Sequence, residues 1–222
     1  ERRTVGMANA NWHCGDVQLR KADSTIFGAD LMFATLEVPF ETVQRVVTTA
    51  AQRNVPVILD ATPIPTSAGR ESLSSSLLKH VDVLLVNWPS ALRLAEMPSA
   101  AGPVGVELAK KLLKLGPKSI VVTMGEHGAM VAEKGKHALV EPFSVREVDS
   151  SGAGDAFAAA LAVGLTDFSR GNWRCEQLLE ATRFALAASA VSITRVGGHS
   201  ALTERDEVER LMAAQPQKGK RK

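Results

Sequence analysis

Short aliphatic runs alternate with segments of helical periodicity, and this alternation limits the fold more than any other feature of the sequence. Four runs are apolar at nearly every position, which is typical of strands buried on both faces: residues 30–36, 55–61, 82–87 and 119–124. Four segments between or beside them are predicted to be helices: residues 39–53, 73–79, 91–97 and 104–115. Since each crossover helix must return over a sheet face, the sequence predicts an α/β fold with a doubly wound, mostly parallel sheet flanked by helices.

The pattern changes after residue 125. Residues 129–133 and 137–141 are predicted to form a short hairpin across residues 134–136, and three helices follow. No domain boundary is evident, so residues 1–214 are interpreted as one domain. Residues 215–222 end in a basic run without apolar side chains and are predicted to be a disordered tail.

Charge and composition exclude several classes of protein. The chain has 222 residues, of which 45% are hydrophobic and 23% charged, enough for a sizeable core. The net charge is +2, and the four basic residues at 218–222 contribute +4, so the rest of the chain sums to −2. This balance argues against a nucleic-acid partner, and the only basis for one would be the terminal basic run.

The apolar stretches are too short for the roughly 20 residues that a bilayer requires, so no membrane segment is expected. No apolar signal core follows the N-terminus. Cys14 and Cys175 are far apart and form no CxxC motif, which agrees with a reducing compartment and predicts a cytoplasmic location.

The most informative motif is the glycine-rich turn before the first of the three closing helices. Gly152 and Gly154 flank Ala153 and let the backbone expose successive N–H groups at a helix N-terminus, which suits an anion. Asp155 in the first helical turn would lie beside that anion and could accept a proton from an attacking hydroxyl. Taken alone, the same residues also fit an ordinary helix start in which Ser151 is the N-cap and Asp155 complements the helix dipole.

Several segments match one family in the same order. Residues 149–155, DSSGAGD, resemble the DTxGAGD signature of the ribokinase-like, or PfkB, carbohydrate kinases. Four further segments are similar to family motifs. Residues 33–39 resemble Q-L-E-x-P, and residues 57–63 resemble L-N-P-A-P. Residues 122–128 resemble T-x-G-x-x-G, and residues 192–197 resemble V-T-R-x-G. The resemblance extends from about residue 7 to residue 212 and implies a ribokinase-like three-layer fold.

The resemblance also implies an activity, ATP-dependent phosphorylation of a sugar. Asp155 would be the general base, and the backbone of Gly152, Ala153 and Gly154 would hold the transferring phosphate. Glu37, at the end of a predicted strand, would accept hydrogen bonds from sugar hydroxyls, which favours D-ribose. Other sugars or nucleosides of the family remain alternatives, namely fructose, 2-keto-3-deoxygluconate and adenosine.

The same resemblance assigns cofactor sites for ATP, Mg²⁺ and K⁺. The residues expected along the nucleotide are Asn87, Thr123, Gly125, Gly128, Ala153 and Gly154. The residues expected around a monovalent cation are Asp149, Ser151, Ser192, Arg195 and Gly197. Arg195 would act through its backbone carbonyl, because a guanidinium carries no acceptor.

Two departures from the family pattern bear on function. The N-E-x-E motif is replaced by Asn87-Trp88-Pro89-Ser90, so both glutamates are missing, including the one that orders magnesium. Trp88 is expected to pack rather than to stack on adenine. The loss of the glutamates favours an alternative in which the protein is a catalytically impaired, nucleotide-binding regulator.

The second departure is length. The family's N-terminal third, with its first strands and lid, has no counterpart, and the chain is expected to begin at a strand containing residues 8–11. Because the lid forms the dimer in many ribokinases, a homodimer is implied only with that part present. The partners expected are therefore a small-molecule sugar and ATP.

Overall fold

The computed structural model describes residues 10–62, 73, 75–98, 105–168, 171 and 173–216. The strands are β1 (Met32–Thr35), β2 (Val57–Asp60), β3 (Val83–Asn87), β4 (Ser119–Thr123), β5 (Ala129–Glu133) and β6 (Lys136–Val140). The α-helices are α1 (Asp16–Lys21), α2 (Asp23–Phe27), α3 (Phe40–Gln52), α4 (Ser75–Leu78), α5 (Trp88–Leu94), α6 (Gly105–Leu113), α7 (Ala153–Thr166), α8 (Cys175–Ser192) and α9 (Arg205–Ala214). Short 3-10 helices cover η1 (Ala10–His13) and η2 (Gly125–His127).

The strands form one mixed sheet in the order β1-β2-β3-β4-β5-β6. Strands β1 to β4 are parallel, and β5 and β6 are antiparallel additions after β4. Register places polar strand ends side by side, since Thr35 pairs with Asp60 and Asn87 pairs with Thr123. The carboxyl edge of the parallel strands is therefore where polar side chains collect, as expected for ligand sites in open α/β sheets.

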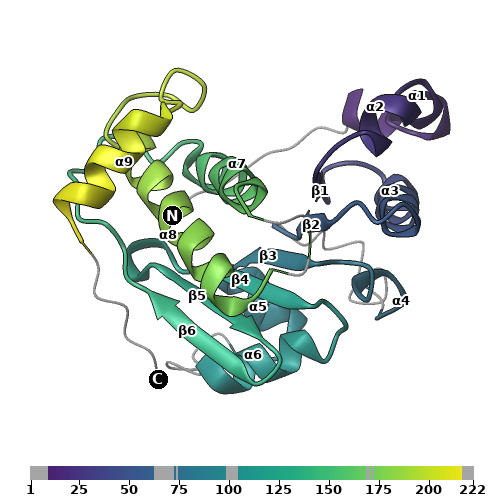
Figure 1. Cartoon of the computed structure of the whole chain (residues 1–222), viewed down its shortest axis with the longest axis horizontal. Coiled ribbons are helices and arrows are strands. Elements are labelled where there is room, and N and C mark those ends of the chain that lie inside the picture. The colour runs from purple at the N-terminus through teal and green to yellow at the C-terminus, as the bar shows by residue number, and fades with distance from the viewer. Residues whose placement is uncertain are drawn as a thin grey trace.

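Helices cover both faces of the sheet (Figure 1), which confirms the predicted three-layer α/β fold. Because successive strand residues point to opposite faces, Leu84 and Val86 pack with α3 to α6, while Val83 and Leu85 pack with α7 and α8. Both sets are buried, which explains why the parallel strands are apolar at nearly every position.

The structure confirms the closing hairpin of β5 and β6, the three final helices and the four strands expected within residues 30–36, 55–61, 82–87 and 119–124. Helix α5 differs, because it begins at Trp88 and not at residue 91. The side chain of Asn87 accepts a hydrogen bond from the Ser90 N–H at 2.9 Å and so starts the helix earlier. Trp88 packs against the core, as expected.

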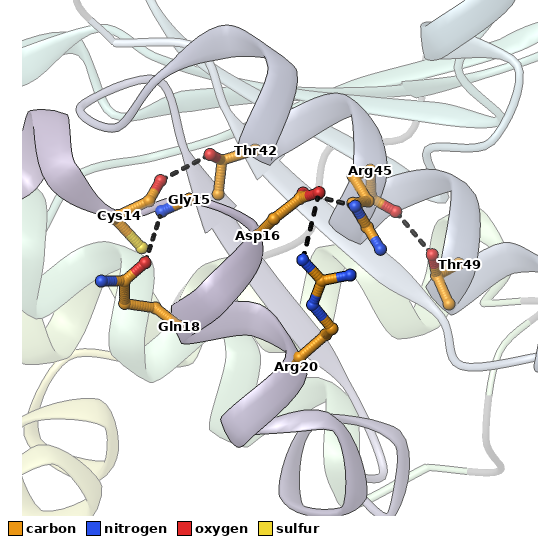
Figure 2. Close-up of polar contacts among 8 residues, drawn as sticks. All are labelled: Cys14, Gly15, Asp16, Gln18, Arg20, Thr42, Arg45 and Thr49. Carbon is orange, nitrogen blue, oxygen red and sulfur yellow. Dashed lines mark hydrogen bonds and ion pairs between the residues drawn. The ribbon is translucent and has the colours of Figure 1, made fainter.

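The segment before β1 departs from the prediction of a strand at residues 8–11. Ala10–His13 is a 3-10 helix, followed by α1 and α2, and residues 8 and 9 lie outside the described residues. Figure 2 shows how polar contacts hold this segment on α3: the Thr42 hydroxyl donates to the Cys14 carbonyl, and Asp16 pairs with Arg45. The Asp16 carboxylate also forms an ion pair within α1, in which its Oδ2 atom lies 4.0 Å from a guanidinium nitrogen of Arg20.

The C-terminal end is folded further than predicted. The Gln215 side chain accepts a hydrogen bond from the Ser144 N–H at 2.9 Å and donates one to the Ser144 carbonyl at 2.8 Å. Gln215 therefore belongs to the folded domain, while residues 217–222 of the predicted tail lie outside the described residues. No helix in the described part of the chain has the length and apolar character to span a membrane.

Candidate active site

A pocket of about 360 Å³ lies at the carboxyl edge of β1 and β2, against the first turns of α7. This volume is within the range of small-molecule sites. Its lining residues are Phe33, Thr35, Glu37, Asp60, Thr62, Asp155, Ala158, Ala159 and Ala162. The small side chains of α7 leave the space open, and the polar groups come from the ends of β1 and β2 and from Asp155 on α7.

The pocket brings together Glu37 and Asp155, which are separated by more than a hundred residues in sequence. Glu37 follows β1, and its N–H donates to the Thr35 hydroxyl at 3.1 Å, which turns the chain at the strand end. Asp155 lies in the first turn of α7 and is exposed to solvent. The two carboxylates predicted to serve the sugar thus line one cavity.

The glycine-rich turn before α7 has the backbone geometry that the sequence predicts. Gly152 is the N-cap residue with φ of 75°, and a Cβ atom there would lie 2.9 Å from the Cα of Gly198. Only glycine meets both conditions without strain. The Ser189 hydroxyl of α8 donates to the Ala153 carbonyl at 3.0 Å and fixes this helix start. Ser151 makes no side-chain cap, because Gly152 occupies that position. The first N–H groups of α7 lack intrahelical acceptors by geometry and suit an anion.

Asp60 is a pocket residue that was not predicted from the sequence. It ends β2, and its Oδ1 atom is shielded from solvent without a hydrogen-bond partner among the described residues. Burial raises the pKa of Asp60 from 3.8 to about 6. Hydrogen bonds from the side chain and backbone of Thr62 lower this pKa, while the charges of Asp155 and Glu37 raise it. The available signal was a carboxylate at a buried strand end, where the resembling family motif has asparagine.

A chain of hydrogen bonds connects this carboxylate to the end of the next strand. The Asn87 N–H donates to the Thr62 hydroxyl oxygen at 3.0 Å, and Thr62 is hydrogen-bonded to Asp60. The Asn87 side-chain oxygen caps α5. Asn87, one of the residues predicted for the nucleotide, therefore lies at the carboxyl edge of the sheet, and its side-chain oxygen is engaged within the protein.

The other predicted nucleotide residues follow β4 at the same edge. Thr123 ends the strand, Gly125 begins η2, and Gly128 follows η2 in the connection to β5. Gly128 has φ of 82°, and a Cβ atom there would lie 2.1 Å from the Val140 carbonyl oxygen. At Gly125, with φ of 58°, a Cβ atom would meet open space. Gly128 is thus required by the fold, whereas Gly125 leaves the strand end open to a ligand.

The residues predicted for a monovalent cation are only partly assembled. The Asp149 carboxylate accepts hydrogen bonds from the N–H groups of Ser151 at 2.9 Å and Gly197 at 2.7 Å, which joins the two loops. The Ser192 hydroxyl donates instead to the Ser189 carbonyl, and the Arg195 guanidinium pairs with Glu207. This pairing agrees with a role for Arg195 through its backbone alone.

The segment in place of the N-E-x-E motif does not fit a magnesium site. Ser90 is buried, with 5% of its surface exposed, and lies in the first turn of α5. Within the described ranges, no group of three His, Cys, Asp or Glu side chains is arranged to hold a metal ion.

Fold and site together define an α/β protein with a polar small-molecule pocket beside a helix N-terminus suited to phosphate. The chain belongs to the PfkB family: the family model described as pfkB family carbohydrate kinase matches residues 8–205.

Similarity to individual proteins supports this family assignment. The chain is 28% identical over 207 residues to ribokinase of Haemophilus influenzae, covering 93% of this chain and 63% of that protein. The crystal structure of ribokinase from Thermotoga maritima matches with a TM-score of 0.70 and 29% identity, covering 86% of this chain and 59% of the other. The structure of Arabidopsis thaliana ribokinase complexed with ribose and ATP matches with a TM-score of 0.71 and 27% identity, covering 89% and 59%. The chain thus spans about three fifths of the length of these ribokinases.

Proposed function

We propose that this chain carries the phosphoryl-transfer site of an ATP-dependent sugar kinase, with D-ribose as the substrate and D-ribose 5-phosphate as the product. One observation carries the proposal: Glu37 and Asp155 line a single pocket at the N-terminus of α7. The ribose and ATP named for the Arabidopsis thaliana relative support the choice of substrate. Fructose, 2-keto-3-deoxygluconate and adenosine are the alternatives to be tested.

In the proposed reaction, Asp155 accepts the proton of the primary hydroxyl as its oxygen attacks the γ-phosphorus of ATP. The bond from that phosphorus to the bridging oxygen of ADP breaks, and ADP leaves. Asp155 suits this task because it is exposed in the pocket and can meet a substrate hydroxyl directly. Backbone N–H groups at residues 152–154 stabilise the charge on the transferring phosphate.

The remaining proposed contacts follow from position. Glu37 would accept hydrogen bonds from ribose hydroxyls. Asn87, Thr123, Gly125 and Gly128 would lie along ATP, whose phosphates bring the magnesium ion. Asp149 joins the loop at Ser151 to the loop at Gly197 by hydrogen bonds. Oxygen atoms of these two loops would coordinate a potassium ion, which would supply positive charge beside the phosphate-binding turn.

The test is ADP release in a coupled assay with D-ribose, MgATP and KCl. We expect ribose-dependent release from this chain and its loss in Asp155→Asn, which keeps the size of the side chain but removes the base. A panel of fructose, 2-keto-3-deoxygluconate and adenosine under the same conditions identifies the substrate. If the chain is shown to be folded and releases no ADP with any of these substrates, the proposal is contradicted.

A second candidate function is that of a regulatory protein, which binds nucleotide without phosphoryl transfer. One observation favours it: Ser90 is buried where the family has a magnesium-ordering glutamate. Calorimetric titration with ATP, with and without Mg²⁺, separates the two. Tight ATP binding without transfer to any sugar would support the regulatory function.

A further inference from the structure

The charge of the pocket distinguishes it from an ordinary polar cavity. Glu37, Asp60 and Asp155 contribute three carboxyl groups, and the lining residues among those described include no lysine, arginine or histidine. The other polar lining groups are the neutral Thr35 and Thr62. A substrate that carries its own negative charge would therefore meet like charge from these described lining residues.

Asp60 is the least exposed of these three carboxyl groups. Its neighbours on β1 and β3 are Thr35 and Leu85, which are uncharged, and Thr62 is hydrogen-bonded to it. The titratable groups that act on it are Glu37, after β1, and Asp155, on α7. Asp60 lines the cavity together with both of these carboxylates, so its charge acts on whatever occupies the cavity.

We propose that Asp60 determines the charge selectivity of this pocket, so that the pocket takes an uncharged polyhydroxylated substrate and rejects a sugar acid. This inference rests on the proposed function and narrows its substrate class. It separates ribose, fructose and adenosine from 2-keto-3-deoxygluconate, which carries a carboxylate.

The selectivity should depend on pH, because the pKa of Asp60 is raised to about 6 by burial. At about pH 8 Asp60 is ionised and adds its charge to the pocket, whereas at about pH 5 it is mostly neutral. An aldonic acid keeps its negative charge at both values, since free carboxyl groups titrate well below pH 5. Rejection of the acid should thus be stronger at the higher pH.

The test compares D-ribose with D-ribonate, the open-chain acid anion in which C1 of ribose is oxidised to a carboxylate, by calorimetric titration of the full chain. We expect the preference for ribose to be about tenfold greater at about pH 8 than at about pH 5. In Asp60→Asn the preference should no longer change with pH. In Asp206→Asn, which removes an exposed carboxylate on α9 outside the pocket, the change should remain.

A preference that does not rise with pH in the unaltered chain, or that rises equally in Asp60→Asn, would overturn the inference. Failure of both ligands to bind would overturn it as well. Because binding requires no phosphoryl transfer, the two proposals fail separately. Selective binding without ADP release refutes the kinase alone, and ADP release with pH-independent selectivity refutes the role of Asp60 alone.

Discussion

Replacement of Asp60 by asparagine should stabilise the protein, and the gain should grow as the pH rises. In the folded protein Asp60 is buried at the end of β2, so its pKa is raised from 3.8 to about 6. The folded state therefore retains a proton that the unfolded state has already lost between these two values. Stability contributed by this group is present below about pH 4 and is lost as the pH rises through 6.

The size of the effect follows from the two pKa values. Since each pH unit corresponds to about 1.36 kcal/mol, ionised Asp60 costs the folded state about 3 kcal/mol above pH 6. About half of this cost is already present at pH 5. The advantage of Asp60→Asn should therefore grow by about 1.4 kcal/mol between pH 5 and pH 7.5. The asparagine amide can still accept hydrogen bonds from Thr62, so the growth with pH isolates the charge.

The assay is urea unfolding of both proteins at pH 5 and pH 7.5. Asp206→Asn is the matched control, because the same chemical change removes an exposed carboxylate from the first turn of α9. Loss of its interaction with the helix dipole should destabilise the protein by up to about 1 kcal/mol, with the opposite sign. An advantage of Asp60→Asn that stays constant or shrinks between the two pH values would refute the reasoning.

Three further substitutions test the site and the fold. Asp155→Asn should lower ADP release by about 100-fold to 10,000-fold while the circular dichroism spectrum is unchanged, because the side chain is exposed; retained turnover would exclude it as the base. Gly128→Ala should cost about 3 kcal/mol or more in urea unfolding, whereas Gly135→Ala, with φ of 81° but open space, should cost about 1 kcal/mol; equal costs would contradict the steric argument. Asp149→Ala should speed hydrogen exchange of the Gly197 N–H by about tenfold, since that group loses its acceptor at 2.7 Å; unchanged exchange would show that Asp149 does not hold the loop.

Local chemistry made the α/β architecture predictable. β3 and β4 are apolar at nearly every position because they are covered on both faces, so they could be located to within a residue. The tight turn at Gly152 could also be predicted from the sequence, because a positive φ beside a helix start requires glycine. Asp155 could be assigned from the motif, since its place in the first turn depends only on sequence distance from that glycine.

Tertiary contacts decided what the sequence left open. Burial and the charges of two distant carboxylates give Asp60 its pKa of about 6, and neither is encoded near residue 60. The start of α5 depends on the side-chain rotamer of Asn87, and the helices before β1 are held by contacts with α3 that no local pattern indicates. The motif therefore predicted where Asp155 lies on its helix, whereas the charge of the pocket arises only when the strand ends and α7 meet in the folded protein.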